Sequence, residues 1–387
     1  MAKIFNYYNS IKSRLPKPKE KQDRIFRYEK YLATKAVPRR ALVSYLVPPI
    51  IDELSGISTQ LFSNNGAGRT IPKVLNQLGY SVDIINWDDT DPVESVYDLV
   101  IFHGGKNFDS IASLKTDANQ LVYYSTGSYW QYHNNQEQQR LKYFEQRHGR
   151  SYKLDREITD SEEAANAEAD AIIALGNEDT ANTYSKFSHV YSLEAASMPI
   201  KSPRTIFKPN GDELGFLFMA GPGNLHKGLD IILDAWQKLP ENYHLHIVTY
   251  LDDEFVKYYK DVLYGTPNIH THGYVLQRSN EFYEIINNCQ YSILLSCSEG
   301  SPGSVIESMH QGLIPIISKE SHVDLCGHGY VLSHNTVVCL IEQLTKLKTE
   351  KSDLLKQQEA ISEWAEKRFA VSRYEKDLAS IISEITK

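Results

Sequence analysis

Short apolar runs recur along the first half of the chain, and each ends in small or polar residues. They lie at 41–47, 79–87, 97–105, 120–128, 169–177 and 189–197. Near-continuous apolar runs of this length are typical of parallel strands that are buried on both faces. Helical residues around 69–78, and a polar stretch at 131–168 that we expect to be helical with a loop, separate some of these runs. The pattern predicts an α/β domain over 41–205.

The alternation restarts after a proline-bearing connection at 199–209. Strands are predicted at 214–221, 243–251, 268–275, 291–300 and 313–318, and helices at 229–239, 280–289 and 304–311. Two successive alternations predict an α/β fold with two doubly wound, Rossmann-like domains, the second over 206–360. A ligand would then bind in the central cleft between the domains, at the carboxyl ends of the strands.

The composition of the 387 residues is that of an ordinary globular protein, with 41% hydrophobic and 23% charged residues. No apolar run reaches the roughly 18 residues that a membrane-spanning helix needs. The opening MAKIFNYYNSIKSRL lacks an apolar core and a small-residue cleavage site, so no secretory signal is predicted. The four cysteines, Cys289, Cys297, Cys326 and Cys339, form no CxxC pair. These features together predict a cytoplasmic protein with reduced thiols.

Charge is spread unevenly along the chain. Residues 1–40 carry twelve Lys and Arg against three Asp and Glu, whereas the whole chain has a net charge of −8. The acidic remainder argues against nucleic acid as a partner. Within this basic N-terminal leader, apolar residues recur at helical spacing over 4–15. We favour a solvated tail or a helix packed on the domain for residues 1–21. The alternative is a segment that lies on the inner face of an anionic membrane.

The segment SCSEGSPGSVIE, residues 296–307, leaves a predicted strand and enters a predicted helix. Amides at a helix N-terminus carry a partial positive charge, so those near Ser304 and Val305 form an anion site whose usual guest is phosphate. Gly300 and Gly303 let the backbone approach that guest closely. The loop therefore predicts a phosphate site at the cleft.

A second anion site is predicted in AGPGNLHKG, residues 220–228, which also joins a strand to a helix. Gly221 and Gly223 loosen the turn, and Lys227 at the helix start supplies a point charge for phosphate. The spacing is not that of a Walker A motif, because Gly228 follows the lysine.

Two glutamates accompany these loops. Glu299 lies at the end of a strand, facing the cleft, where a carboxylate can accept hydrogen bonds from hydroxyls. Glu307 alone fits the ordinary preference of acids for the first turn of a helix. Two phosphate sites with two carboxylates suit a sugar nucleotide, whose diphosphate needs amides and a cation and whose sugars need hydrogen-bond acceptors.

Four motifs over about 214–332 carry a resemblance to a known family. They are the KG step Lys227-Gly228, the step Gly273-Tyr274-Val275, the E-x7-E pair Glu299 and Glu307 in SEGSPGSVIES, and the step Gly312-Leu313-Ile314-Pro315-Ile316. In this order they resemble the family-4 (group 1) retaining glycosyltransferases of the GT-B fold. The first half of the chain matches that family only in its general βα pattern.

The resemblance implies roles for these positions. Lys227 contacts the diphosphate of the donor, Glu299 holds the donor sugar, and Glu307 holds the ribose hydroxyls. The base of the nucleotide lies near Tyr274 and Val275. The other donor-binding positions are the small residues and amides of the two loops, namely Gly221, Gly223, Gly300, Ser301, Gly303, Ser304 and Val305. The last helix, about 361–387, is expected to cross back onto the N-terminal domain.

One position departs from the family pattern. An arginine usually stands six residues before the lysine, and here that position is Gly221. Arg69, in the expected loop NNGAGRT at 64–70, or Arg204 is expected to supply the missing cation; otherwise activity is weaker or the donor differs.

The N-terminal domain of the family also brings a glycine-rich loop and a histidine to the reaction centre. Gly66 and Gly68 fit that loop, together with Arg69. His133 is our preferred histidine, with His103 as the alternative, although either also fits an ordinary loop histidine.

The segment HVDLCGH, residues 322–328, places His322, Asp324, Cys326 and His328 at alternate positions. Alternate residues on a strand share one face in a line, which cannot close a tetrahedral zinc site alone. We therefore predict no metal site in the chain.

The resemblance implies transfer of a sugar, with retention and without a metal or other cofactor, from a nucleotide-diphosphate sugar to a glycan, lipid-linked or other hydroxyl acceptor. Another GT-B enzyme, such as a phosphorylase or epimerase, is one alternative. The other is a sugar-nucleotide-binding subunit without turnover, which the absence of the arginine at Gly221 would mark.

Overall fold

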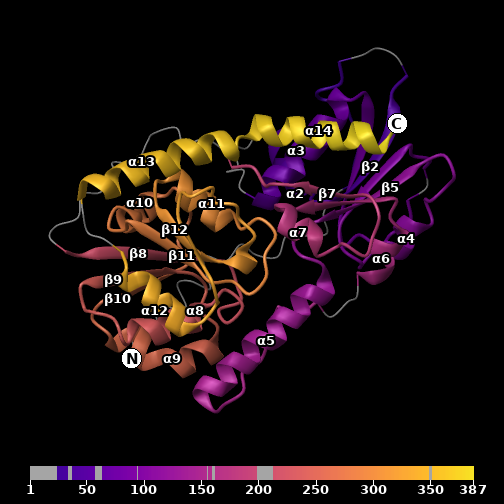
Figure 1. The fold of residues 1–387 in the computed structure, drawn as a ribbon. Coiled ribbons are helices and arrows are strands. Elements are labelled where there is room, and N and C mark those ends of the chain that lie inside the picture. The colour runs from indigo at the N-terminus through magenta and orange to yellow at the C-terminus, as the bar shows by residue number, and fades with distance from the viewer. Residues whose placement is uncertain are drawn as a thin grey trace.

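Two separate sheets divide the chain into two α/β domains, which confirms the predicted pair of Rossmann-like domains (Figure 1). The computed structural model describes residues 24–33, 37–56, 63–93, 95–154, 156–158, 162–197, 212–347 and 351–387. Residues 1–21, for which contact with an anionic membrane is the less favoured alternative, and Arg204 lie outside these residues. No helix in the described ranges is long and apolar enough to cross a membrane.

The first domain contains a seven-stranded sheet in the order β1-β3-β2-β4-β5-β6-β7. Its strands are β1 (Ile25–Tyr28), β2 (Arg39–Tyr45), β3 (Tyr80–Asn86), β4 (Leu99–Phe102), β5 (Gln120–Ser125), β6 (Ala171–Leu175) and β7 (Val190–Leu193). Neighbours pair in parallel, except that β1 runs antiparallel to β3 at the edge. The six parallel strands coincide with the six predicted apolar runs. Strand β1 is not predicted, and it lies within the region assigned to the basic leader.

The second domain contains a six-stranded, fully parallel sheet in the order β10-β9-β8-β11-β12-β13. Its strands are β8 (Leu214–Met219), β9 (Tyr243–Val248), β10 (Ile269–Gly273), β11 (Tyr291–Leu294), β12 (Ile314–Ser318) and β13 (Tyr330–Leu332). Strands β8 and β11 are adjacent, so the loops that follow them leave the same edge of the sheet side by side.

Helices join the strands of the first domain. They are α2 (Pro48–Leu54), α3 (Ser63–Gln77), α4 (Phe108–Ala112), α5 (Trp130–His148), α6 (Glu163–Glu168) and α7 (Glu178–Asn182). Helix α3 begins before the predicted position, so Gly66 and Gly68 are helical and the prediction of a glycine-rich loop over 64–70 is wrong. A Cβ atom on Gly68 would lie 3.2 Å from the Leu46 Cβ. Close packing on that segment offsets the poor helix propensity of glycine.

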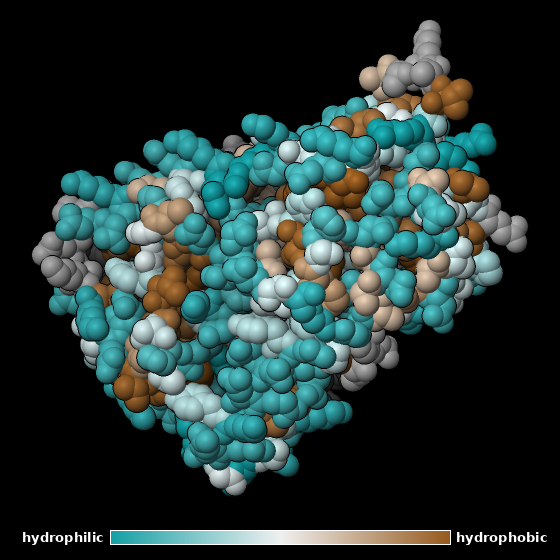
Figure 2. Space-filling model, turned by 45° about the vertical axis from the view of Figure 1, so that its right-hand side comes forward, coloured by the Kyte–Doolittle hydropathy of each residue, from teal (hydrophilic) through white to brown (hydrophobic). Residues whose placement is uncertain are grey.

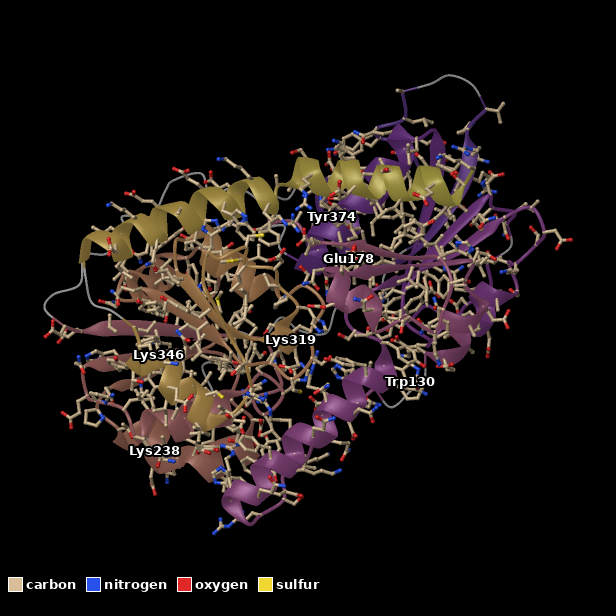
Figure 3. All side chains as sticks on the ribbon, viewed as in Figure 1. Trp130, Glu178, Lys238, Lys319, Lys346 and Tyr374 are labelled. Atoms are coloured by element: carbon tan, nitrogen blue, oxygen red, sulfur yellow. The ribbon has the colours of Figure 1, made fainter. Side chains whose placement is uncertain are left out.

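The second domain and the C-terminus contain the remaining helices. They are α8 (Leu229–Trp236), α9 (Asp253–Gly265), α10 (Asn280–Ile286), α11 (Gly303–His310), the 3₁₀ helix η1 (Lys319–Ser321), α12 (Val337–Thr345), α13 (Lys351–Arg368) and α14 (Val371–Ile385). The single helix expected over 361–387 is two helices. Helix α13 contacts α11 and β12 of the second domain, whereas α14 contacts α3 and β7 of the first. The Tyr374 hydroxyl on α14 lies 3.0 Å from that of Tyr124 on β5 (Figure 3).

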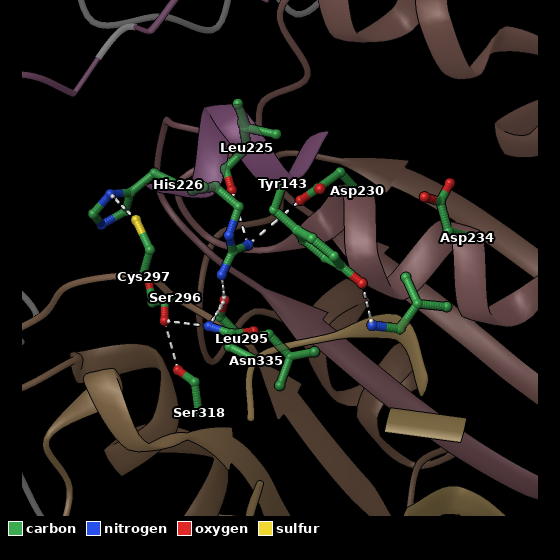
Figure 4. A network of polar contacts seen from close by, with 12 residues as sticks. Tyr143, Leu225, His226, Asp230, Asp234, Leu295, Ser296, Cys297, Ser318 and Asn335 are labelled. Carbon is green, nitrogen blue, oxygen red and sulfur yellow. Dashed lines mark hydrogen bonds and ion pairs between the residues drawn. The ribbon is translucent and has the colours of Figure 1, made fainter. Parts of the chain in front are cut away.

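Helix α5 begins in the first domain and extends along the second (Figure 1). The buried guanidinium of Arg140 donates to the carbonyl oxygens of Leu225 and Leu295 at 3.2 and 2.7 Å (Figure 4). It also lies 3.5 Å from Asp230 on α8, which pairs with Arg147 as well. A polar helix of one domain is therefore anchored in the interior of the other.

Most of the buried apolar side chains form one continuous cluster that includes residues of both domains. A second cluster lies within the first domain and a third within the second. On the face drawn in Figure 2, hydrophilic residues predominate and hydrophobic residues form separate patches. The two domains are thus packed against each other, and a ligand site has to lie where cavities remain between them.

Candidate active site

A cavity of about 930 Å³ lies between the two domains. The second domain contributes the loops after β8, β9, β10 and β11, and the first domain contributes Asn64, Asn65, Thr126, Arg156 and Leu175. The predicted site residues that line it are Gly221, Lys227, Tyr274, Val275, Glu299, Ser301, Gly303 and Ser304. The two predicted anion loops therefore open into one space.

Lys227 and Glu299 form an ion pair at this cavity. The Lys227 ammonium and the Ser296 hydroxyl both donate to Glu299 Oε1. Burial disfavours the charged form of Glu299, but attraction to Lys227 and His226 outweighs it and holds the pKa of this carboxyl well below its usual range. Glu299 is thus a carboxylate of fixed orientation, able to accept hydrogen bonds from hydroxyls.

The N-terminus of helix α11 faces the same cavity. Pro302 precedes the helix, and no side chain caps its first amides. The Val305 amide donates to the Pro302 carbonyl at 3.1 Å, whereas the amides of Gly303 and Ser304 donate to no group among the described residues. The unsatisfied amides of this anion site are therefore those of Gly303 and Ser304, one residue earlier than the predicted pair.

Gly300 and Ser301 face the first domain. A Cβ atom on Gly300 would lie 2.3 Å from the Leu175 carbonyl oxygen and 2.8 Å from the Gly127 Cα. The Ser301 hydroxyl accepts the Ala195 amide at 3.2 Å. In this part of the loop, glycine therefore permits the backbone of the second domain to approach the backbone of the first closely.

Arg156 is a cavity residue that sequence reasoning missed. Its side chain extends from the segment after α5 over the loop that carries Lys227, where a Cβ atom on Gly223 would lie 2.7 Å from the Arg156 Cγ. Gly223 has a φ of 100°, which favours glycine in any case. No ion pair engages Arg156 among the described residues. It therefore brings a positive charge that no ion pair engages to the cavity that Gly221 and Lys227 also line.

Arg69, the predicted source of that charge, lies elsewhere. Its guanidinium is 3.1 Å from Glu53, and the hydroxyls of Tyr28 and Tyr31 donate to the same carboxylate at 2.6 Å. Arg69 and Gly66 line a separate cavity of about 270 Å³ beneath α14. Gly66 and Arg69 are therefore away from the main cavity, whereas Asn64 and Asn65 of the same segment line it.

Two aromatic rings line one end of the main cavity. Tyr250 follows β9 and Tyr274 follows β10, and their rings stack with centroids 4.8 Å apart and planes 13° apart. Tyr274 is 50% exposed, so one face of this pair is open to a planar ligand. Tyr250 is not predicted, because nothing in the sequence pairs it with Tyr274.

Glu307 is placed differently from its predicted role. Both of its oxygens accept hydrogen bonds from Arg278, at 2.9 and 2.8 Å, and Gln311 donates to Oε1 at 2.8 Å. Glu307 is buried and does not line the main cavity, whereas Gln277, which precedes Arg278 in the chain, does. The contact of Glu307 with the ribose hydroxyls therefore stays a prediction.

A second cavity, of about 490 Å³, adjoins the first, and the two share the lining residues Thr126, Arg156 and Glu299. His133 and His103 both line this second cavity, together with Trp87. Burial lowers the pKa of both imidazoles. The preferred histidine, His133, and the alternative, His103, therefore both lie at this cavity.

The two histidines are held in different ways. His103 Nδ1 lies 2.9 Å from the Tyr124 carbonyl oxygen, and His133 Nε2 lies 2.7 Å from that of Arg156. His133 is thus bound to the segment that carries Arg156 and adjoins His226, whose ring centroid is 5.2 Å away.

The residues that could hold a metal ion lie behind Glu299. His133 and Glu137 on α5 and His226 in the loop after β8 bring their donor atoms within 4.8 Å of one another. Burial opposes protonation of His226, but Cys297, Glu137 and Glu299 outweigh it and raise the pKa of the imidazole to about 10. In the segment 322–328, by contrast, the side chains diverge: His322 faces Glu299 and Ser128, and His328 stacks on Trp364.

Comparison with known proteins finds a family match for the second domain. Residues 215–350 match the family described as glycosyl transferases group 1. No curated protein matches the chain.

Solved structures resemble the whole chain. HepE of Anabaena, crystallised with UDP and glucose, is 14% identical, with a TM-score of 0.56 over 90% of this chain and 100% of that one. Sucrose-phosphate synthase of Thermosynechococcus elongatus is 13% identical, with a TM-score of 0.59 over 90% and 99%. The lipopolysaccharide outer core galactosyltransferase WaaB is 13% identical, with a TM-score of 0.59 over 89% and 99%. These similarities confirm the predicted GT-B fold.

Proposed function

We propose that this chain, whose second domain belongs to the glycosyl transferases group 1 family, transfers a sugar from a nucleotide-diphosphate sugar to a hydroxyl acceptor with retention. The observation that carries the proposal is the convergence of Lys227, Glu299 and the N-terminus of α11 on one cavity between the domains. HepE, which shares the fold, has been crystallised with UDP-glucose. A nucleotide sugar is therefore the donor that fits both the residues and the fold.

The cavity offers a separate environment for each part of such a donor. The diphosphate lies against the amides of Gly303 and Ser304 and between the positive charges of Lys227 and Arg156. The base stacks beside the tyrosine pair, and Glu299 accepts hydrogen bonds from the sugar hydroxyls.

In the reaction, the bond between the anomeric carbon and the diphosphate oxygen breaks as a bond to the acceptor oxygen forms on the same face of the sugar. Negative charge grows on the diphosphate, where Lys227, Arg156 and the helix amides stabilise it more strongly than in the ground state. The leaving phosphate oxygen takes the proton of the acceptor hydroxyl. These fixed charges make a metal ion at the diphosphate unnecessary.

The acceptor occupies the second cavity, because it opens onto the first beside Glu299. Trp87 offers an apolar ring face, and Ser125 and Glu162 offer hydrogen-bonding groups, a combination suited to a carbohydrate or another hydroxyl-rich acceptor. Of the two histidines at this cavity, His103 lies where its Nε2 can orient that hydroxyl, because only its Nδ1 is engaged by a carbonyl.

The test is a panel of UDP-, GDP- and ADP-sugars without added divalent metal, read by thermal shift and by donor hydrolysis. The wild-type protein is expected to be stabilised by one nucleotide class and to hydrolyse it slowly. In Glu299→Gln, hydrolysis should fall by roughly 10²-fold or more, since a charge aimed at the donor sugar is lost. Glu241→Gln, at an exposed position, is the matched control.

The outcomes separate the alternatives. Stabilisation without hydrolysis, persisting when acceptor sugars are added, would support a binding subunit without turnover. No stabilisation by any nucleotide sugar would contradict the proposal as a whole.

The basic leader has its own test. If residues 1–21 hold the protein on an anionic membrane, their deletion releases it from phosphatidylserine vesicles in a sedimentation assay. Equal sedimentation of both forms would exclude this peripheral contact.

A further inference from the structure

We propose that His133, Glu137, His226 and Cys297 form a structural binding site for a zinc-type transition-metal ion, placed behind Glu299 at the junction of the two domains. This cluster is built from three separate segments. His133 and Glu137 lie four residues apart on one side of α5, His226 lies in the loop after β8, and Cys297 lies in the loop after β11. The inference does not depend on the proposed reaction.

Glu137 and His226 lie close to each other and to both remaining residues of the cluster. Cys297 Sγ lies 3.1 Å from Glu137 Oε1 and 3.4 Å from His226 Nδ1, and Glu137 Oε1 contacts His226 Nδ1 (Figure 4 shows His226 beside Cys297). The donor atoms of His133 lie within 4.8 Å of those of Glu137 and His226. Tetrahedral zinc with sulfur and nitrogen ligands holds its donor atoms about 3.5 Å apart. Glu137 and His226 are thus shared by two sets of donor atoms, one completed by His133 and one by Cys297, and side-chain rotation would have to bring His133 and Cys297 onto the same ion.

The cluster is buried, and its polar groups are incompletely satisfied. Glu137 and His226 are each 1% exposed, Cys297 is 4% exposed and His133 9%. Glu137 Oε2 has no hydrogen-bond partner among the described residues. A buried carboxylate oxygen without a partner is unfavourable, and a cation that it could ligate removes that penalty.

The surrounding contacts match those of metal-bound histidines, which usually donate their second ring N–H to a carbonyl or carboxylate. His133 Nε2 lies 2.7 Å from the Arg156 carbonyl oxygen, which leaves Nδ1 for the ion. His226 Nε2 lies 3.7 Å from Glu299 Oε1, while Nδ1 faces Glu137 and Cys297. The His133 ring is thus oriented by a carbonyl outside the cluster, and the His226 ring turns its Nε2 toward the Glu299 carboxylate at a longer distance.

Such a site would fix the geometry of the neighbouring cavity. It would tie α5 of the first domain to both anion loops of the second. It would also hold Arg156 through His133 and Glu299 through His226. The alternative occupant is a proton on His226, shared with Glu137 in a purely hydrogen-bonded network.

The test measures metal directly. The full chain, purified under reducing conditions, is analysed for bound metal and then titrated with Co²⁺ as a spectroscopic probe. We expect about one zinc per chain, or one Co²⁺ bound with a thiolate charge-transfer band in the near ultraviolet and strong visible bands typical of a tetrahedral ion. Cys297→Ser should lose the thiolate band, and Glu137→Gln should weaken metal affinity tenfold or more.

Cys339→Ser is the matched control, because Cys339 lies on α12 outside the cluster, and it should keep both the metal and the band. If Cys297→Ser does not fold, the wild-type and Cys339→Ser spectra still decide the question. A reduced wild-type protein that holds only trace metal and shows no thiolate band with added Co²⁺ or Zn²⁺ overturns the inference and leaves the proton network. Neither readout uses a nucleotide sugar, so this failure is distinct from failure of the proposed function.

Discussion

Arg156 brings a positive charge from the first domain to the loop around Gly221 and Gly223. Replacing it with alanine should lower affinity for the nucleoside diphosphate by roughly 10- to 100-fold, because a charged hydrogen bond to phosphate contributes about 1.5–3 kcal/mol. Arg156→Lys should recover part of that loss, since lysine keeps the charge but not the fork of donors. Isothermal titration with the diphosphate of the preferred nucleotide measures both.

The control for this prediction is Arg150→Ala. Arg150 is exposed, and it lies over the ring of Tyr258 away from the cavity. Equal diphosphate affinity in the Arg156 variant, the Arg150 variant and the wild type would show that the missing cation is supplied by another group.

At the scale of single elements, the polar residues of α5 are structural. Arg140→Met should leave the carbonyls of Leu225 and Leu295 without a donor and Asp230 with one cation fewer. Loss of one partner from such a buried set costs about 3–5 kcal/mol. Urea unfolding should therefore show a clearly lower midpoint than for Gln139→Met, an exposed position on the same helix. Equal midpoints would show that the anchoring is not stabilising.

The loop after β11 gives a second prediction at this scale. Gly300→Ala places a Cβ atom 2.3 Å from the Leu175 carbonyl oxygen, so the domains have to separate to relieve the contact. We expect a larger radius of gyration in X-ray scattering, a loss of about 1–3 kcal/mol in stability, and a higher KM for the donor. Gly265→Ala, where nothing lies within 4 Å of the added atom, is the control. An unchanged radius and KM would show that the loop adapts locally.

The sequence predicted the parallel strands because each is apolar on both faces, and it predicted the two loops after β8 and β11 from their glycines and charges. Strand β1 was missed because an edge strand with two exposed residues lacks that signal. The predicted start of helix α3 was too late because Gly66 and Gly68 are poor helix formers. Only tertiary packing explains why they are helical.

There is a physical reason why the rest of the site could not be predicted from the sequence. From the sequence, Glu137 and Arg140 look like the solvated face of a polar helix, since their partners lie 85 to 160 residues further along the chain. Arg156 has no local motif at all. Long-range pairing of polar residues leaves no periodic pattern, so these roles appear only in three dimensions.

At the scale of the whole molecule, a group of histidines should set the stability in acid. His244 and His246 on β9 face His270 and His272 on β10, with ring nitrogens 3.3 and 3.1 Å apart across the strands. Burial first, and then the neighbouring imidazoles, lower the pKa of His246 to about 3. Below pH about 6.5 the unfolded chain therefore binds a proton that the native state does not, and stability falls as pH falls toward 3.

The free energy of unfolding should drop through this window by up to about 1.4 kcal/mol per pH unit for His246 alone. His246→Phe should flatten the pH dependence of urea unfolding between pH 7 and about pH 5, whereas His334→Asn, at an exposed position, should leave it unchanged. Parallel curves for all three proteins would show that His246 is not the titrating group.

Helix α5 also limits how this chain can be divided. The family match covers residues 215–350, as if they were a transferable module. Cut out alone, that module would expose Asp230, Asp234 and the Leu295 carbonyl, whose partners Arg140 and Arg147 belong to the other half. A chimera that exchanges the second domain at the connecting segment must therefore also exchange α5 or match its charges.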